Sequence, residues 1–470
     1  MESSAPAHTR LFATLRAIHH GWRSVFLTLL SLLGLGLLST PAQAVPAYAR
    51  QTGQDCIACH VGGFGPQLTP FGRAFKLGGY TLQGSTKNSV PLLSAMLVMS
   101  YTHTAQPYGD NNFMGPPPQG FSANDNFTAL QQASIFLAGR LTDHIGMFGQ
   151  ATYADPADSP PSRLAWDNTE IRYAHDYSMG QTTGIFGVSV NNNPTLSDVW
   201  NTVPAWQYSY MGPPFGQSGP YASPVIYGLG GGVVGASAYT LINNHWYVEA
   251  GAYHNLSTYW ANLLHASNAS LQDNAPYWRA WYSNTVGPHV FEVGVLGMNG
   301  KINTNGDPMP GPTDDFKDVG ADATYQFLNG GPHLVTANFI YMHERQDMNQ
   351  AFADGGSSNP SNTLNNGSPN VSYWYDNTYG ATVGFFNSTG SSNATFYSAS
   401  ATGSPNTSGA ILELDWNPFG KSWTNPEKNL RLGLQYTLYN KYLGAAHNFD
   451  GNGTNASDMN TLYLYLWTAI

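Results

Sequence analysis

The feature that most constrains the fold is an alternation of apolar and polar side chains with a period of two. It begins after Pro91 and continues to the C-terminus in segments of about ten residues, separated by stretches rich in Gly, Pro, Asn and Ser. A period of two is typical of β-strands with one apolar and one polar face. In the first segment one face carries Leu93, Ala95, Leu97, Met99 and Tyr101, and the other carries Ser94, Met96, Ser100 and Thr102.

The composition places these strands in a membrane. Charged residues make up only 10% of the chain, whereas aromatic residues reach 13%, with 28 Tyr and 12 Trp. Ordinary soluble domains contain about 25% charged residues, so a soluble β-protein would not combine the alternation with so few charges. The net charge of −10 is modest and argues against nucleic acid as a partner. The sequence therefore predicts a mainly β fold, an antiparallel transmembrane β-barrel.

Sixteen candidate strands can be marked within residues 91–470. They are 92–103, 126–141, 144–154, 163–175, 182–190, 225–240, 245–255, 276–285, 289–298, 315–328, 332–344, 371–387, 392–402, 408–417, 428–441 and 460–470. Their connections alternate between long, as at 104–125 and 345–370, and short, as at Asn243-Asn244. Bacterial outer-membrane barrels have an even strand number, short periplasmic turns and longer outer loops. We therefore expect about 16 strands, with both ends of the barrel on the periplasmic side.

Many of the few charged residues fall on the face expected to line the lumen. They are Arg140, Glu170, Arg172, Glu249, Arg279, Glu292, Asp318, Asp322, Glu413 and Arg431. A Lys or Arg on the lipid face at mid-depth costs about 2–4 kcal/mol, so the bilayer favours inward placement. These residues could form a network of mixed sign that bridges strands, or a conduit for ions or docking surface within the bore.

The first 44 residues are predicted to be an export signal. Three arginines precede an apolar run at 25–38, and Ala42-Gln43-Ala44 supplies a small-x-small cleavage site. The alternative is a membrane anchor, but a span needs about 20 residues and this run has 14. The mature chain would then begin at Val45 in an oxidising compartment.

Both cysteines of the chain lie in one short motif, Cys56-Ile57-Ala58-Cys59-His60. This is the pattern for attachment of a c-type haem, in which two thiols three residues apart add to the vinyl groups and the histidine becomes an axial ligand of the iron. A thioredoxin-like dithiol is the alternative, but it needs a βαβ setting that the segment lacks. We therefore predict one covalent haem c on Cys56 and Cys59, with His60 as iron ligand.

The residues after the motif predict a short helix. Thr69 can cap its N-terminus, Pro70 suits its first turn, and Gly78-Gly79 supplies its end. Leu68, Phe71 and Phe75 would share a face against the porphyrin, and Arg73 and Lys76 would either pair with propionates or face solvent. Residues 45–90 are too short for a comfortable core of their own, so this small α-helical haem domain is expected to lean on the periplasmic mouth of the barrel.

A sixth haem ligand is not visible within 61–90, which contain neither His nor Met. Met96, Met99 and His103 on the first strand are the nearest candidates. Met96 should face the lumen and Met99 the lipid, while His103 should lie near the outer rim, so Met96 is the preferred candidate. A five-coordinate site, a loop residue, or plain packing of Met96 beneath a plug are the alternatives.

At this point the chain resembles the outer-membrane cytochrome–porin fusions of Fe(II)-oxidising bacteria. The resemblance rests on "ARQTGQDCIACHVGGFGPQLTPFGRAFKLGGY" followed directly by the barrel, on "NNNPTLSDVWNTVPAW" and on "FLAGRLTDHIGMFGQATY". It implies a monohaem protein of the outer membrane that takes electrons from extracellular Fe(II) and passes them to periplasmic cytochromes, as an Fe(II) oxidase would.

Two other functions stay open at the level of sequence. One is a diffusion porin whose haem domain acts as a sensor or plug, and the other is electron export to an outside acceptor. The sequence shows no nucleophile–base pair, so hydrolytic activity is not expected.

Overall fold

The computed structural model describes residues 47–84, 92–109, 113–154, 164–266, 269–303, 311–419 and 429–469. The predicted export signal and its cleavage site lie outside the described residues. Residues 44–470 form one compact unit. No helix among the residues described is long and apolar enough to cross a membrane.

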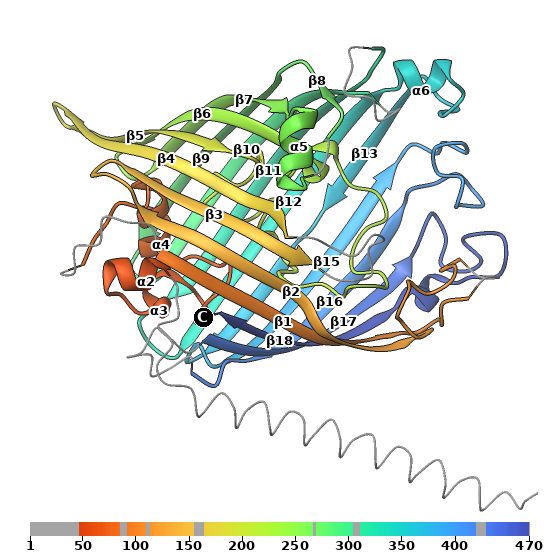
Figure 1. Ribbon diagram of the computed structural model, residues 1–470, viewed down its shortest axis with the longest axis horizontal. Helices are drawn as coiled ribbons and strands as arrows, with labels where there is room; N and C mark the ends of the chain where they lie inside the picture. Colours follow the sequence, from red (N-terminus) through yellow and green to blue (C-terminus); the bar gives the residue numbers. More distant parts are fainter. Residues whose placement is uncertain are drawn as a thin grey trace, which may run out of the picture. The chain divides into compact units, whose positions relative to one another are not determined.

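The described strands form a single closed antiparallel sheet (Figure 1). They are β1 (Leu92–Thr104), β2 (Asp125–Arg140), β3 (Ile145–Ala154), β4 (Ala165–Met179), β5 (Thr182–Asn191), β6 (Val233–Ile242), β7 (Trp246–Asn255), β8 (Leu271–Gln272), β9 (Ala275–Val286), β10 (His289–Ile302), β11 (Asp314–Leu328), β12 (His333–Asp347), β13 (Ser361–Gly367), β14 (Asn370–Tyr375), β15 (Tyr379–Gly390), β16 (Thr407–Trp416), β17 (Asn429–Lys441) and β18 (Thr461–Ala469). Pairing of β1 with β18 closes the barrel.

Sixteen positions around the wall are filled by these eighteen strands. The two-residue β8 pairs with β10 just ahead of β9, and β13 and β14 share one place between β12 and β15. The prediction of a 16-stranded antiparallel barrel is therefore confirmed, and this is the architecture of porin-like outer-membrane barrels. We call the end with the tight turns, where Leu92 and Ala469 also lie, the short-turn end, and the opposite end the long-loop end.

The correct number of strands arose from two strand assignments that were wrong in compensating ways. The predicted strand 371–387 is two strands, β14 and β15, and 392–402 is not a strand but part of the connection after β15. The predicted long connection 345–370 contains β13. The turn that went unrecognised is Asp376-Asn377, where both residues have positive φ angles of 52° and 51°. Such a pair forms the tight hairpin turn that suits twisted strands, as Asn243-Asn244 does between β6 and β7.

The two faces of the wall are as the alternation predicts. On β1, Ser94, Met96 and Ser100 are buried inside, whereas Leu93 and Leu97 are exposed outside. Nine of the ten predicted lumen charges are buried, and Arg140, at the end of β2, is half-buried. The outward face is largely apolar, as a lipid-facing surface requires.

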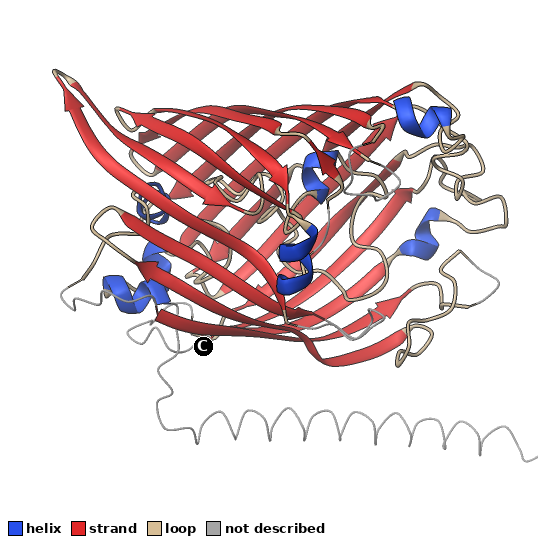
Figure 2. Ribbon diagram, turned by 45° about the horizontal axis from the view of Figure 1, so that its top comes forward, coloured by secondary structure: helices blue, strands red, loops and turns tan. Residues whose placement is uncertain are grey.

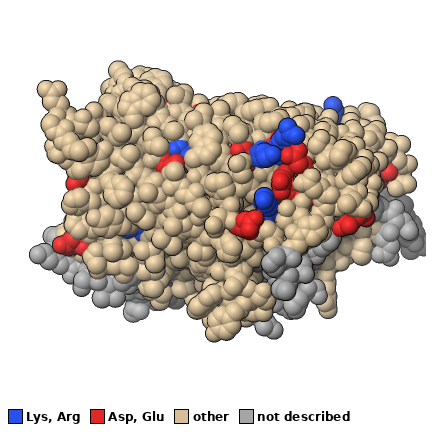
Figure 3. All heavy atoms as spheres, turned by 90° about the horizontal axis from the view of Figure 1, so that it is seen from above, with Lys and Arg blue, Asp and Glu red and all other residues tan. Residues whose placement is uncertain are grey.

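Exposed charges lie mainly near the long loops. Figure 3 shows one side of the barrel, where most of the surface is uncharged and the Lys, Arg, Asp and Glu side chains gather mainly toward one end. Exposed ion pairs at strand ends next to the long loops join Lys317 to Asp347, Arg345 to Asp347, and Lys301 to Asp273.

Two segments occupy the bore. The first, which we call the N-terminal segment, is residues 47–84 with helices α2 (Ala47–Thr52), α3 (Cys56–Cys59) and α4 (Pro70–Leu77), which contacts the wall at the short-turn end. The second, the inward loop, is residues 192–232 between β5 and β6, and it contains the 3-10 helix η1 (Val225–Gly228). The predicted strand 225–240 is therefore wrong in its first part, since β6 begins only at Val233.

The remaining short helices are α5 (Thr258–Leu264), α6 (Asn349–Ala353) and η2 (Ala456–Met459), and they lie in connections between strands (Figure 2).

Candidate functional site

The cysteine motif forms one helical turn. Helix α3 consists of the four residues Cys56–Cys59, and the backbone N–H of His60 closes it by donating to the carbonyl of Cys56 at 2.8 Å. Residues three apart on a helix share a face, so both thiols project to the same side of the turn. Both cysteines are free, Cys56 is buried and Cys59 is half-buried.

Helix α4 follows as predicted and packs tightly on this turn. The Thr69 hydroxyl caps it by accepting from the N–H of Gly72 at 3.2 Å, Pro70 occupies its first turn, and Gly78 ends it. The N–H of Thr69 donates to the carbonyl of Cys59 at 2.9 Å. A Cβ at Gly72 would lie 2.3 Å from that same carbonyl oxygen, so only glycine allows the two helices to approach so closely.

The imidazole of His60 is oriented by one hydrogen bond. Its Nδ1 lies 2.5 Å from the carbonyl oxygen of Gly65, and because a carbonyl can only accept, Nδ1 carries the proton. The lone pair is then on Nε2, the atom left for a metal. Burial lowers the pKa of His60 to about 4, opposed by the Gly65 bond and assisted by the charge of Arg431. The ring is therefore neutral at neutral pH, which is the form that ligates metals.

The loop that carries Gly65 is fastened to the barrel wall. We call residues 61–67 the glycine loop, since Gly62, Gly63 and Gly65 in it have positive φ angles of 77°, 84° and 103°. The guanidinium Nη2 of Arg431 on β17 donates to the carbonyls of Phe64 at 2.7 Å and Gly62 at 3.1 Å. The Gly62 carbonyl also accepts from the amide of Asn417.

Wall residues next to the motif present polar atoms that fit a bound group. The amide Nδ2 of Asn429 lies 3.8 Å from the Cys56 Sγ. The Oδ1 of Asn429 and the Nε1 of Trp467 are buried and have no hydrogen-bond partner among the described residues, and these two residues lie on the neighbouring strands β17 and β18. Buried polar groups normally have partners. The free thiol pair, the available His60 Nε2 and these two atoms therefore fit a covalently attached haem c.

Both thiols stay protonated near neutral pH. Burial raises the pKa of Cys56 to about 11, opposed by the Asn429 amide, and burial with the neighbouring Cys56 raises that of Cys59 to about 11. Because the thiolate is the reactive form, this setting slows unassisted oxidation of the pair to a disulfide.

The three candidate sixth ligands lie in different places. Met96 is buried on the inner face of β1 and packs with Phe64 of the glycine loop and with Trp467. It shares a transverse row with Asn429, because both pair with Ala469 of β18. Strands are about 4.8 Å apart, so the Cα atoms of Met96 and Asn429 are about 10 Å apart.

Met99 and His103 are poorly placed for the same role. Met99 lies on the outer, half-buried face of β1. His103 is seven residues beyond Met96, about 23 Å along the strand, and its Nδ1 contacts Asp125 at 2.8 Å. Of the three, only Met96 faces the bore, as predicted.

Of the two alternatives for Arg73 and Lys76, exposure to solvent is wrong, because both residues are buried and face the bore. The Nη1 of Arg73 donates to Gln326 Oε1 at 2.8 Å, and its guanidinium lies 3.8 Å from the ring centroid of Trp200. The Nζ of Lys76 donates to the carbonyls of Leu196 at 2.5 Å and Asp198 at 2.9 Å. These bonds engage the Lys76 ammonium and one nitrogen of Arg73 with the wall, the inward loop and the N-terminal segment itself.

The predicted apolar face is also divided. Phe75 is buried between Tyr48 and Tyr80, with ring centroids 4.9 and 5.8 Å away. Phe71 is exposed and Leu68 is half-buried, so these two keep surface that a porphyrin could cover.

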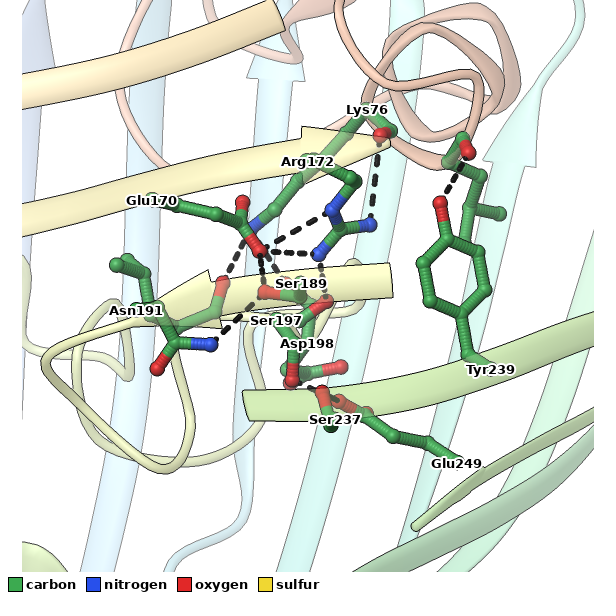
Figure 4. Close-up of polar contacts among 12 residues, drawn as sticks. Lys76, Glu170, Arg172, Ser189, Asn191, Ser197, Asp198, Ser237, Tyr239 and Glu249 are labelled. Atoms are coloured by element: carbon green, nitrogen blue, oxygen red, sulfur yellow. Dashed lines mark hydrogen bonds and ion pairs between the residues drawn. The ribbon is translucent and has the colours of Figure 1, made fainter. Parts of the chain in front are cut away.

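A buried polar network joins the N-terminal segment, the inward loop and the wall (Figure 4). Arg172 of β4 pairs with Glu170 at 2.6 Å and also donates to the carbonyls of Lys76 and Ser197 at 3.3 and 3.1 Å. The Tyr239 hydroxyl donates to the carbonyl of Leu77 at 2.6 Å. The lumen charges thus bridge strands and hold the bore contents, which supports the first of the two interpretations of these residues.

The inward loop is held by a second network, in which the wall residues Arg279 and Asp322 were predicted to line the lumen but the loop residues Asp198 and Thr202 were missed by sequence reasoning. Arg279 on β9 contacts Asp198 at 3.2 Å and Asp322 at 2.5 Å, and the Thr202 hydroxyl donates to Asp322 at 2.5 Å. Asn201 donates to the carbonyl of Pro66 in the glycine loop. The only sequence signal was the polar density of "NNNPTLSDVW", which gives no direction to the side chains.

Apart from any haem, no metal site is apparent in the described part of the chain. No three His, Cys, Asp or Glu side chains converge there in a way that could hold a metal ion.

Comparisons with known proteins give only distant likenesses. No protein-family model matches the chain, and no curated protein matches it. Among solved structures it is similar to the in-vitro folded outer membrane protein OmpT of Vibrio cholerae, with a TM-score of 0.44, 11% identity, and coverage of 82% of this chain and 99% of that one. It is also similar to the outer membrane channel DcaP of Acinetobacter baumannii, with a TM-score of 0.43, 12% identity, and coverage of 81% of this chain and 96% of that one. A third similar structure is an anion-selective porin from Comamonas acidovorans, with a TM-score of 0.43, 10% identity, and coverage of 81% and 98%. None reaches a TM-score of 0.5, so what the site can do has to come from its own residues.

Proposed function

We propose that this chain is an outer-membrane electron-transfer protein that carries one haem c on Cys56 and Cys59, with His60 as axial ligand. Extracellular Fe(II) would give up one electron to become Fe(III), and the electron would pass to a periplasmic cytochrome. The observation that carries the proposal is the pair of free thiols on one helical turn, followed by a histidine whose Nε2 is available, fastened at the mouth of the barrel.

The chain's own residues have defined tasks in this proposal. The haem, when bound, supplies a one-electron couple whose potential depends on its axial ligands. His60 offers Nε2 because its Nδ1–H is bonded to Gly65. Met96 is the proposed sixth ligand. The barrel would lie in the outer membrane with its short-turn end in the periplasm, after removal of residues 1–44 as an export signal.

A second candidate is a diffusion channel whose N-terminal segment acts as a plug. The fold itself favours it, because barrels of 16 strands are wide enough to hold an aqueous channel. The two segments in the bore argue against free diffusion, because the N-terminal segment and the inward loop bond to each other and to the wall. One cavity beside the inward loop, lined by Tyr208, Tyr227 and Asn370, has a volume of about 240 Å³.

Two experiments test these candidates. Chain produced with haem-attachment machinery should show a covalent haem spectrum that is lost in a Cys56→Ala, Cys59→Ala double variant. Rapid mixing of the oxidised protein with Fe(II) should then reduce the haem promptly, and absence of reduction at every pH tried would sink the proposed donor. Liposomes containing wild-type protein should not swell in small sugars, whereas free permeation would favour the channel.

A further inference from the structure

Arg431 differs from the other buried arginines on the described strands. Arg172 and Arg279 each contact a carboxylate oxygen closely, at 2.6 and 2.5 Å. Among the residues that the structure describes, the nearest carboxylate oxygen to Arg431, on Asp415, is 3.9 Å from its Nε. Its closest partners are instead the backbone carbonyls of Phe64 and Gly62. A buried guanidinium that is not closely paired with a carboxylate is costly, so its position calls for a role.

The surroundings of Arg431 fix the direction of its guanidinium. Its central carbon lies 5.0, 4.9 and 5.4 Å from the ring centroids of Phe64, Trp374 and Trp467. Its Nε donates to Asn417 Oδ1 at 3.2 Å. Stacking on aromatic rings and a planar fork of donors are properties that lysine lacks. The guanidinium is therefore held in one orientation, aimed at the glycine loop.

The glycine loop is shaped to transmit that orientation. The carbonyl of Phe64 accepts from Arg431, and the carbonyl of the next residue, Gly65, accepts from His60 Nδ1 at 2.5 Å. Consecutive peptide groups share a Cα, so fixing one carbonyl restricts the other. The fit at Gly62 leaves no slack, because a Cβ there would lie 2.4 Å from the Trp374 indole.

We propose that Arg431 is a positioning residue for His60, which it acts on through the carbonyls of the glycine loop. This inference rests on the proposed haem at Cys56 and Cys59. A hydrogen bond from the non-ligating nitrogen fixes the ring and raises its basicity as a ligand. A more basic imidazole stabilises ferric over ferrous iron. A residue of the barrel wall that does not contact His60 therefore influences the redox potential of the haem.

Arg431→Lys tests this inference, because it keeps the positive charge and removes the fork. Loosening the hydrogen bond to Gly65 should favour the ferrous form. We expect the ferric–ferrous equilibrium to shift roughly tenfold toward ferrous, which raises the reduction potential by about 59 mV for one electron. The measurement is a spectroelectrochemical titration of the purified holoprotein. Arg345→Lys is the control, since it also replaces an arginine of the barrel wall, but one in an exposed ion pair with Asp347 rather than at the glycine loop, and it should leave the potential unchanged.

A second readout does not need haem. In haem-free chain labelled with 15N-histidine, the His60 signal, identified by its loss in His60→Ala, should report a proton on Nδ1 in the wild type and a mixture of tautomers in Arg431→Lys. Equal reduction potentials in the wild type and Arg431→Lys, together with an unchanged His60 tautomer, would overturn the inference. If Arg431→Lys fails to fold, Asn417→Ala removes one bond from Arg431 and one from Gly62, and should shift both readouts in the same direction. Wild-type chain without covalent haem would instead defeat the proposed function, while the tautomer measurement still decides the role of Arg431.

Discussion

The hydroxyl of Tyr80 donates a hydrogen bond to Glu170 Oε2 at 2.5 Å, which ties the end of the N-terminal segment to strand β4. Both residues are buried, and Glu170 also accepts from Arg172 and from Ser189, each at 2.6 Å. The Tyr80 ring stacks on Tyr48 with centroids 5.1 Å apart. One side chain thus combines an aromatic contact within the segment with a polar contact to the wall.

Tyr80→Phe should weaken docking of the N-terminal segment without disturbing the aromatic stack. Leaving the buried Glu170 oxygen without its donor costs roughly 1–3 kcal/mol. Protease cleavage within residues 47–84 should become about tenfold faster if opening is rapid, since cleavage then follows the population of the open form. Tyr259→Phe, at a residue on α5 that is 69% exposed, is the control and should change nothing. Equal cleavage rates in wild type and Tyr80→Phe would contradict the importance of this bond.

Docking of the segment should strengthen as the pH rises above 8. Burial lowers the pKa of Lys76 from 10.5 to about 8; the groups that face it are Glu170, Arg172, Asp198 and Glu249. Between these two values the released segment holds a proton that the docked one has lost, so the free energy of docking becomes more favourable with pH. Lys76→Met should abolish this dependence.

The measurement is the ratio of cleavage rates of the two proteins at the same pH. Taking the ratio cancels the pH profile of the protease itself. Wild type should gain protection relative to Lys76→Met from pH 8 to pH 9.5, and a constant ratio would show that Lys76 does not titrate on docking.

Met96→Leu and Met99→Leu form a matched pair for the sixth ligand. The two residues lie three apart on β1, but Met96 is buried in the bore and Met99 lies on the outer face. A methionine ligand raises the potential of a c-type haem, so Met96→Leu should lower it and abolish the charge-transfer band of methionine-ligated ferric haem. Met99→Leu should leave both unchanged. Identical spectra in all three proteins would exclude methionine ligation from β1.

Arg279→Gln should release the inward loop. It leaves the carboxylates of Asp198 and Asp322 buried without their cation, a change that typically costs about 3–5 kcal/mol. The loop should become sensitive to protease, and liposomes containing the variant should begin to swell in small sugars. Arg345→Gln removes an exposed ion pair with Asp347 and should shift the free energy of unfolding by about 0.5 kcal/mol or less. If Arg279→Gln neither makes liposomes swell nor is cleaved faster than wild type, the inward loop does not seal the bore.

The faces of the strands could be predicted from the sequence because a lipid phase imposes a strict rule on every second residue. Leu464 is exposed while Tyr463 and Tyr465 are buried, as the alternation on β18 predicts. The turn between β14 and β15 could not be found in this way, because the alternation continues on both sides of Asp376-Asn377. The helix after the cysteine motif, α4, was also predictable, because Thr69, Pro70 and Gly78 act locally.

The interior of the bore could not be predicted from the sequence. Arg73 and Lys76 are in a short helix, and local rules place such residues in solvent. Their partners are Gln326, 253 residues away, and the carbonyls of Leu196 and Asp198, 120 and 122 residues away. The identity of the proposed sixth haem ligand likewise depends on groups that the chain brings together only when it is folded.

The contacts of the glycine loop also set an order of events during assembly. Gly62 and Phe64 are translated early, yet Asn417 and Arg431, which hold them, are 355 and 367 residues later, with Arg431 on the penultimate strand. The loop cannot reach its final form until nearly the whole chain is available to fold. Under the proposed function, haem would therefore be attached to Cys56 and Cys59 while the segment is loosely held, and closure of the barrel would then fix the haem centre in its mouth.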